Sequence, residues 1–298
     1  MSSKKVDDSK KSRYITYFLI LLFLGLPVLG IVTSDLGQSS EELSEELVTQ
    51  YTHTVSNSGQ NTLHEAGFQE GSVQTYSTLA AGYAHTCAIL DDGSVSCWGY
   101  NNYGQLGDGT TTDRNTPTQT SSLGTDRTAV AITVGFAHTC AILDDGSVSC
   151  WGYNSYGNLG DGTNTDRSTP TQTSSLGTDR TAVAITGGDY HTCAILDDGS
   201  VSCWGSNGEG QLGDGTTTSR NTPTQTSSLG TGRTAVAISA GGLHTCAILD
   251  DGSVNCWGYN GYGQLGDGTG SNRNTPTQTS SLGTGRTAVA ITAGYYHT

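Results

Sequence analysis

Lysine is absent from the chain after Lys11, and all formal positive charge beyond residue 34 comes from eight arginines. The same stretch carries 25 aspartates and glutamates, so its formal charge is −17. A surface with this balance repels polyanions and lacks the basic patch that nucleic-acid binding requires. The sequence therefore argues against a DNA- or RNA-binding protein.

The chain also lacks the short motifs of common enzymes and metal sites. It contains no G-x-S-x-G, no phosphate-binding G-x-x-x-x-G-K-[ST] loop and no H-E-x-x-H. Its eight cysteines never stand in C-x-x-C spacing, which argues against zinc. We therefore predict no enzymatic activity, no cofactor and no metal site.

Repetition is the dominant feature of the sequence. A unit of 53 residues recurs, with copies beginning at residues 85, 138, 191 and 244 and a fifth begun at 297. The first two copies are identical at 46 of 53 positions. A fixed period of this length is typical of repeat proteins, in which each unit buries its apolar face against its neighbours. The 42 glycines, nearly all in the repeats, favour short strands joined by tight turns.

The N-terminal part predicts export. Residues 1–13 are basic, and residues 14–33 form an uncharged apolar run long enough to cross a bilayer as a helix, with the N-terminus in the cytoplasm. A cleaved signal peptide is the alternative, because residues 28–30 resemble a small-residue cleavage site. Residues 35–80 are polar and acidic, as in a linker, and residues 81–298 hold the repeats. The repeats are therefore expected outside the cell, either anchored or secreted.

Each repeat predicts four short strands. In the second copy, residues 128–134 alternate in period two, as in a strand covered on both faces. Residues 138–143 and 147–152 are predicted to pair around the turn 144–146, and residues 169–176, with a proline near their start, to form an edge strand. Four antiparallel strands per repeat describe a β-propeller blade. We therefore predict an all-β fold.

The repeat motif G-x-x-H-T-C-A-I-L-D-D-G-S-V-S-C-W-G-x-N-x-x-G-Q-L-G-D-G-T resembles the repeat of the regulator of chromosome condensation family. In the second copy the matching positions are Gly135, His138, Thr139, Leu143, Asp145, Gly146, Val148, Trp151, Gly152, Asn154, Gly157, Leu159, Gly160 and Gly162. The resemblance covers residues 81–298 and implies a β-propeller, usually of seven blades, in exchange factors, photoreceptors or secreted inhibitors of β-lactamase.

This chain departs from that pattern in three ways. It has only four full copies, it carries paired cysteines, and it lies behind an export segment. The given sequence also stops in mid-motif after His297-Thr298. We therefore expect an incomplete gene or fragment, and an open or incomplete propeller of about four blades.

The cysteines always stand ten residues apart across one predicted hairpin. If Leu90 and Ser94 close its turn, Cys87 lies opposite Cys97 at a non-hydrogen-bonded site, where Cα atoms approach to roughly 4.5 Å. In an exported chain such pairs predict structural disulfides, with buried free thiols as the alternative. The pairs are Cys87–Cys97, Cys140–Cys150, Cys193–Cys203 and Cys246–Cys256.

Other repeated side chains are expected to be structural. One histidine and one tryptophan per copy fit a buried hydrogen-bonding group and a core aromatic between blades better than a metal ring. These are His85, His138, His191, His244 and His297, and Trp98, Trp151, Trp204 and Trp257. Aspartates in the turns, such as those at 91–93 and 108–113, invite calcium, but their spacing is not that of known calcium loops, and Asp-Gly also suits tight turns. The question of calcium stays open.

The copies differ mainly in three loop regions: the pair before each His-Thr, the residues after each Trp-Gly, and residues 111–113 with their equivalents. A fixed scaffold with varying, tyrosine-rich loops is typical of a binding surface, although neutral drift in exposed loops is the alternative. The candidates are Tyr83, Tyr100, Tyr103, Phe136, Tyr153, Tyr156, Asp189, Tyr190, Glu209, Leu243, Tyr259 and Tyr262.

We therefore predict an exported, membrane-anchored repeat protein that binds a protein or another cell-surface macromolecule through these loops. Two alternatives remain open. One is a guanine-nucleotide exchange-factor-like signalling regulator, as the family resemblance alone implies. The other is a cell-surface structural element with no discrete partner.

Overall fold

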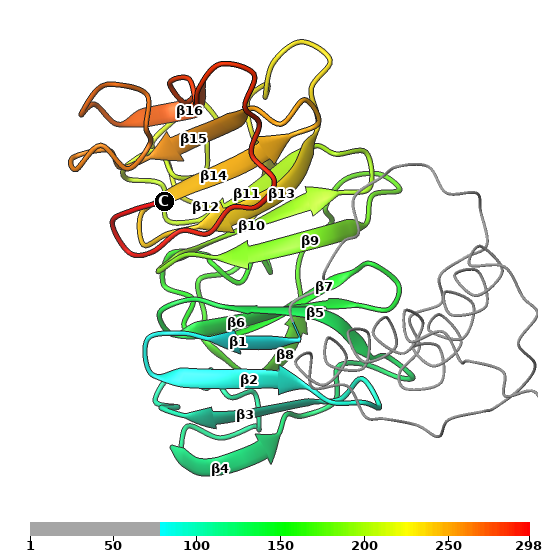
Figure 1. Cartoon of the computed structure of the whole chain (residues 1–298). Coiled ribbons are helices and arrows are strands. Elements are labelled where there is room, and N and C mark those ends of the chain that lie inside the picture. Colours follow the sequence, from blue (N-terminus) through cyan, green and yellow to red (C-terminus); the bar gives the residue numbers. More distant parts are fainter. Residues whose placement is uncertain (1–77) are drawn as a thin grey trace, which may run out of the picture. The chain divides into compact units, whose positions relative to one another are not determined.

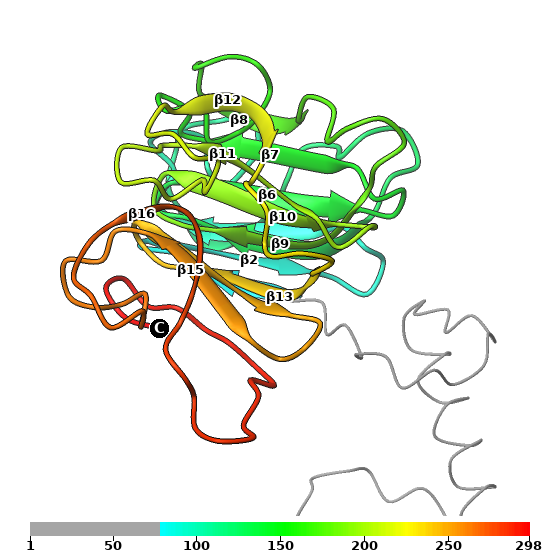
Figure 2. The same ribbon diagram turned by 90° about the horizontal axis from the view of Figure 1, so that it is seen from above.

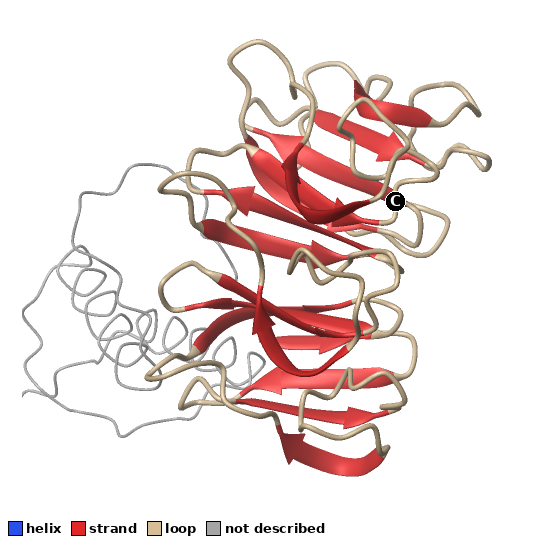
Figure 3. Ribbon diagram, turned by 180° about the vertical axis from the view of Figure 1, so that it is seen from behind, coloured by secondary structure: helices blue, strands red, loops and turns tan. Residues whose placement is uncertain are grey.

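The computed structural model describes residues 78–298, which form sixteen strands in four separate antiparallel sheets (Figure 1). No helix lies among these residues (Figure 3), and within them nothing helical could span a membrane. The all-β prediction is confirmed for this part. The predicted apolar segment 14–33 and nearly all of the linker 35–80 lie outside the described residues.

Each sheet is a four-stranded meander whose strands pair in chain order. The first blade contains β1 (Leu79–Ala81), β2 (His85–Ile89), β3 (Val95–Gly99) and β4 (Arg114–Gln119); the second β5 (Ala129–Val134), β6 (His138–Leu143), β7 (Val148–Gly152) and β8 (Arg167–Gln172); the third β9 (Ala182–Gly187), β10 (His191–Leu196), β11 (Val201–Gly205) and β12 (Arg220–Gln225); the fourth β13 (Ala235–Ala240), β14 (His244–Leu249), β15 (Val254–Gly258) and β16 (Arg273–Gln278).

The central hairpin of each blade has the predicted turn. In the second blade the amide of Leu143 donates to Ser147 O and the amide of Gly146 donates to Leu143 O. Gly146 has φ 76°, a conformation that glycine adopts without steric cost. The turn sets the register, so that Cys140 lies opposite Cys150 as expected.

The fourth strand of each blade was predicted two residues too late and too long. In the second blade it runs over Arg167–Gln172, not residues 169–176. Its start is fixed by the ion pair between Arg167 and Asp161, with Nη2 2.8 Å from Oδ2. Its end comes where the amide of Ser174 turns away to donate to Gly160 O. Neither contact can be predicted from the hydropathy pattern of the sequence.

The blades stack in chain order, with the first and fourth at opposite ends of the stack (Figures 1 and 2). Each interface has its own core. Trp151 of the second blade is 0% exposed and packs with Leu106 and Val95 of the first. Trp204 and Trp257 are buried in the same way one and two blades on, which confirms the predicted role of these tryptophans. Trp98, in the first described blade, is only half-buried.

The open arrangement expected for the repeats agrees with this stack. No core cluster in residues 78–298 joins the first blade to the fourth. The free face of the fourth blade instead packs against the segment that follows it, where Ala288 and Ile291 contact the cluster that contains Leu265.

The structure links each cysteine pair in a disulfide, and every bridge spans the two middle strands of its blade. The Cα atoms of Cys140 and Cys150 are 4.1 Å apart, as at a non-hydrogen-bonded site. Both cysteines are fully buried among the residues that pack one blade on the next. The bridges therefore hold the hairpins at the centre of the repeat core.

Candidate binding face and axial cavity

The turns between the first and second strands of the blades meet along one line. The amide of Phe136 donates to Asp189 O, that of Asp189 to Gly242 O, and that of Gly242 to Tyr295 O, each at 3.2 Å. These four residues occupy the same position in successive copies. Backbone hydrogen bonds therefore join turn to turn across blades, and the side chains at this position form one set.

A glycine just before this position lets the turns approach. A Cβ on Gly135 would overlap Gly188 O of the next blade and the ring of His138 in its own blade. The equivalent glycines 188 and 241 stand in the same relation to the blades that follow them. Any other residue here would push neighbouring blades apart.

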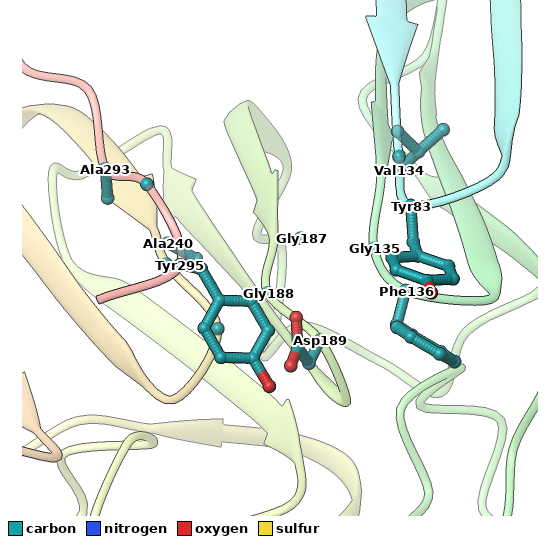
Figure 4. A pocket seen from close by; sticks show the side chains of 14 residues that line it. Tyr83, Val134, Gly135, Phe136, Gly187, Gly188, Asp189, Ala240, Ala293 and Tyr295 are labelled. Carbon is teal, nitrogen blue, oxygen red and sulfur yellow. The ribbon is translucent and has the colours of Figure 1, made fainter. Parts of the chain in front are cut away.

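The turns surround a cavity of about 330 Å³, which we call the axial cavity (Figure 4). Its walls are mostly glycine and alanine backbone, with a few larger side chains at the rim. The lining residues are Gly82, Tyr83, Val134, Gly135, Phe136, Gly187, Gly188, Asp189, Ala240, Gly241, Gly242, Ala293, Gly294 and Tyr295.

Asp189 is the one ionisable carboxyl group in this lining. The Tyr295 hydroxyl points at it and donates a hydrogen bond to the carboxylate (Figure 4). Burial raises the pKa of Asp189, although this hydrogen bond acts in the opposite direction. The negative charge of Asp189, with burial, raises the pKa of Tyr295 to about 12. No lysine, arginine or histidine lines the cavity.

Seven predicted candidates join into one group of rings beside the cavity, which we call the aromatic face. Tyr190 is its centre, with ring centroids 5.5 Å from Phe136, 5.6 Å from Tyr153 and 5.2 Å from Tyr156. Phe136 stacks on Tyr83 at 4.6 Å. The members, drawn from three blades, are Tyr83, Tyr100, Tyr103, Phe136, Tyr153, Tyr156 and Tyr190.

A second, smaller cluster forms at the fourth blade. Tyr259 and Tyr262 were predicted candidates, and they contact Tyr296 at 6.4 and 5.1 Å between centroids. Tyr295 packs edge-on against Tyr296 at 4.3 Å. Tyr295 and Tyr296 were not among the candidates, although they form the varying pair just before the fifth copy. Their equivalence to residues 83 and 84 could have found them.

Three candidates lie outside both groups of rings: Asp189, which lines the axial cavity, Glu209 and Leu243. The Glu209 carboxylate accepts a hydrogen bond from Asn272 Nδ2 of the next blade. Leu243 is half-buried, and its carbonyl accepts from the amide of Tyr259 at 2.9 Å.

The repeated histidines connect the blades. Nε2 of His138 lies 3.0 Å from the Thr192 hydroxyl of the next blade, and His191 and Thr245 repeat the contact at 2.9 Å. Burial lowers the pKa of His138 and of His191 to about 3, and neighbouring histidines add to the effect. Each ring is thus a neutral hydrogen-bonding group between blades, as expected from the sequence.

The aspartates of the long loops serve the loops themselves. Asp108 accepts from Thr110 and from Arg114 Nε, at 2.7 Å each. Burial raises its pKa, but these hydrogen bonds and the arginine charge outweigh burial and leave the pKa lowered. Asp113 accepts from the amide of Asn101 at 2.7 Å. No group of three or more metal-ligating side chains occurs within residues 78–298.

Consecutive four-stranded meanders with one tryptophan between each pair define a propeller-type repeat scaffold. Residues 55–298 match the family model of the RCC1-like domain, and the chain belongs to this family. The resemblance noted in the repeat motif is confirmed.

The chain is 36% identical over 221 residues to the ultraviolet-B receptor UVR8 of Arabidopsis thaliana, covering 74% of this chain and 49% of that protein. It is 37% identical over 201 residues to the probable E3 ubiquitin-protein ligase HERC4 of Homo sapiens, covering 66% of this chain and 19% of that protein. The chain therefore spans about half, or less, of the length of these relatives.

Solved structures agree on the fold. Human WBSCR16 superposes with a TM-score of 0.63 at 20% identity, covering 79% of this chain and 62% of that one. Yeast RCC1 (Prp20), in its complex with Kap60, gives 0.63 at 22%, covering 72% and 51%. At these identities the likeness shows the fold alone, which is the propeller scaffold.

Proposed function

We propose that this protein is an exported, membrane-anchored RCC1-like repeat protein that binds a macromolecular partner through its aromatic face. The observation that carries the proposal is the joining of seven variable rings, from three blades, into one group. Tyrosine-rich surfaces supply large contact area at low entropic cost and are enriched at protein interfaces. Drift in separate loops gives no reason for the rings to touch.

Two further features support export. Four buried disulfides are typical of an oxidising compartment. The apolar run 14–33 behind a basic flank suits an anchor. Yeast RCC1, a relative in fold, was solved bound to Kap60, so a protein of this fold can bind another protein. An exchange-factor role would need a cytosolic location, which both features argue against.

The test is site-specific photocrosslinking on intact cells. A photoreactive residue replaces Tyr83, which is 78% exposed on the aromatic face. A matched chain carries it at Leu282, which is 52% exposed beside the Asp251–Ser253 turn, at the far end of the strands. We expect only the chain with the photoreactive residue at position 83 to form a discrete adduct with a partner. Reagents that do not cross membranes should label this adduct, because we propose that the repeats lie outside the cell.

Affinity for the adduct partner is then measured with the purified chain. Tyr190→Ser should weaken binding by about 30-fold, the loss typical of a central aromatic anchor, while Leu282→Ser should leave it unchanged. The proposal would be wrong if position 83 gave no adduct, or if Tyr190→Ser and Leu282→Ser bound the partner with equal affinity. The variation among these rings would then be explained by neutral drift. An adduct formed only inside the cell would favour the signalling regulator.

A further inference from the structure

The axial cavity is asymmetric in one respect. The residue that reaches it from the turns of successive blades is Tyr83, Phe136, Asp189 and Gly242, followed by Tyr295 after the fourth blade, so the third blade alone contributes a carboxylate. The fourth blade contributes no side chain. A Cβ on Gly242 would already lie 3.3 Å from Asp189 Oδ2 and 3.2 Å from Tyr295 O, so a larger side chain there would crowd the carboxylate.

The carboxylate of Asp189 has no positive partner in the cavity wall. Its hydrogen bond from Tyr295 is neutral, and burial raises its pKa, as expected for an acid that lacks a cation. Seven of the eight arginines of the repeats pair with aspartates elsewhere; Arg167, for example, pairs with Asp161, and Arg180 pairs with the Asp197–Asp198 turn. A cation arriving from outside would therefore meet a half-buried carboxylate without a cationic partner in the cavity lining.

The opposite wall suits the rest of a basic side chain. Tyr83 and Phe136 stack at 4.6 Å and line the cavity across from Tyr295 (Figure 4). Aromatic faces attract cations, and they also pack well against the alkyl chains of lysine and arginine. The cavity volume of about 330 Å³ leaves room for such a side chain.

We propose that the axial cavity receives a lysine or arginine side chain of the protein partner, with its charged head on Asp189 and its alkyl chain against Tyr83 and Phe136. The inference rests on the proposed function, because the cavity opens among the turns that carry the aromatic face. A formal charge of −17 beyond residue 34 also favours approach of a basic partner. The cavity thus gives this face its selectivity for charge.

The test uses the full-length chain in detergent and two capped tripeptides, Gly-Arg-Gly and Gly-citrulline-Gly. Citrulline keeps the shape of arginine without its charge. Binding is measured by saturation-transfer NMR titration. We expect the arginine peptide to bind about tenfold more tightly than the citrulline peptide, and Asp189→Asn to remove that difference. Lowering the pH until Asp189 is protonated should remove it as well.

Two more variants distinguish binding in the axial cavity from attraction to the overall negative charge of the protein. Asp179→Asn makes the same charge change in an exposed loop, at a position of φ 55° that asparagine also tolerates, and should bind as the parent does. Gly242→Leu crowds the Asp189 carboxylate and should abolish binding. It should still fold, because the equivalent positions carry tyrosine, phenylalanine and aspartate.

Equal binding of both peptides, or an effect of Asp179→Asn as large as that of Asp189→Asn, would overturn the inference. So would ethylammonium binding as tightly as the arginine peptide, since the site would then hold a small free amine. If Asp189→Asn leaves affinity for the crosslinked partner intact while Tyr190→Ser lowers it, the inference fails and the proposed function stands.

Discussion

Nε2 of His138 lies 3.0 Å from the hydroxyl of Thr192, which belongs to the next blade. The same threonine hydroxyl donates to Asn158 O at 3.0 Å. His138 and Thr192 are both buried, at 1% and 0% exposed. One hydrogen-bonded histidine thus fastens each blade to its successor. Because the threonine hydroxyl donates to Asn158 O, Nε2 of His138 is the donor, and protonation of its unpartnered Nδ1 would place a charge in the buried interface.

Stability should fall as the pH drops below the ordinary histidine pKa. Burial lowers the pKa of His138 and His191 from 6.5 to about 3, so the unfolded chain takes up their protons before the folded chain does. The free energy of unfolding should therefore decrease from pH 6.5 downward until about pH 3, by about 1.4 kcal/mol per pH unit for each histidine. Urea unfolding at a series of pH values measures this slope.

His191→Gln supplies the control. It removes one titrating group, so the slope of the free energy of unfolding against pH should decrease by about 1.4 kcal/mol per pH unit, the contribution of one proton. Stability at neutral pH should also fall. Equal stability at about pH 7.5 and about pH 4.5 would show that these rings are protonated or exposed in the folded protein.

The disulfides should contribute stability without forming the site. The double variant Cys140→Ala, Cys150→Ala removes a bridge between residues ten apart in the sequence. In the chain-entropy model this lowers the free energy of unfolding by about 3 kcal/mol. The melting temperature of the double variant should fall by about 5 to 10 °C. Binding of the partner at a temperature where the variant is folded should be retained.

Intact mass before and after alkylation is the check on the bridges themselves. Four disulfides leave no cysteine to alkylate until the protein is reduced. Eight free thiols in the protein isolated from its native cells would contradict both the bridges and the argument for export.

Much of this architecture could be predicted because it is local. A turn of fixed length sets Cys140 opposite Cys150, and one tryptophan in each copy marks the core between blades. The fourth strand was misplaced because Arg167 and Asp161 fix its start, and an ion pair between a loop and a strand leaves no periodic signal.

The site was harder, because its parts come from different copies. Tyr153 and Tyr190 belong to loops of successive blades, and their contact depends on how far one blade is rotated against the next. The bond between Asp189 and Tyr295 joins turns two copies apart. The variable residues could thus be named from the sequence, but their assembly required the geometry of the stack.

The glycines before the axial turns should tolerate no side chain. In Gly135→Ala the new Cβ would overlap Gly188 O and the His138 ring, so two blades must separate or the turn must move. We expect a loss of about 2 to 3 kcal/mol or more in the free energy of unfolding. Gly208→Ala is the matched control, because nothing lies within 4 Å of the new Cβ there. Equal stability of the two variants would disprove the close approach of the turns.

The long loop of each blade should depend on one buried asparagine. Asn154 is 0% exposed; its Oδ1 accepts from the amide of Leu159 at 2.9 Å, and its Nδ2 donates to Thr163 O at 3.1 Å and Thr165 O at 3.0 Å. Asn154→Ala leaves these backbone groups buried and unpaired, and should cost about 2 to 4 kcal/mol in chemical unfolding.

Asn154→Asp separates hydrogen bonding from size. It keeps the acceptor for Leu159 but loses both donors and places a second carboxylate near Asp161, whose Oδ1 is 3.3 Å from Asn154 Nδ2. It should therefore destabilise at least as much as alanine, and acid should partly relieve the loss. Asn102→Ala is the control: Asn102 is exposed and is replaced by Ser155 and Gly208 in later copies, so a change within about 0.5 kcal/mol is expected. If Asn154→Ala were as mild as this control, the loop would be held by its Asp161–Arg167 pair rather than by the asparagine.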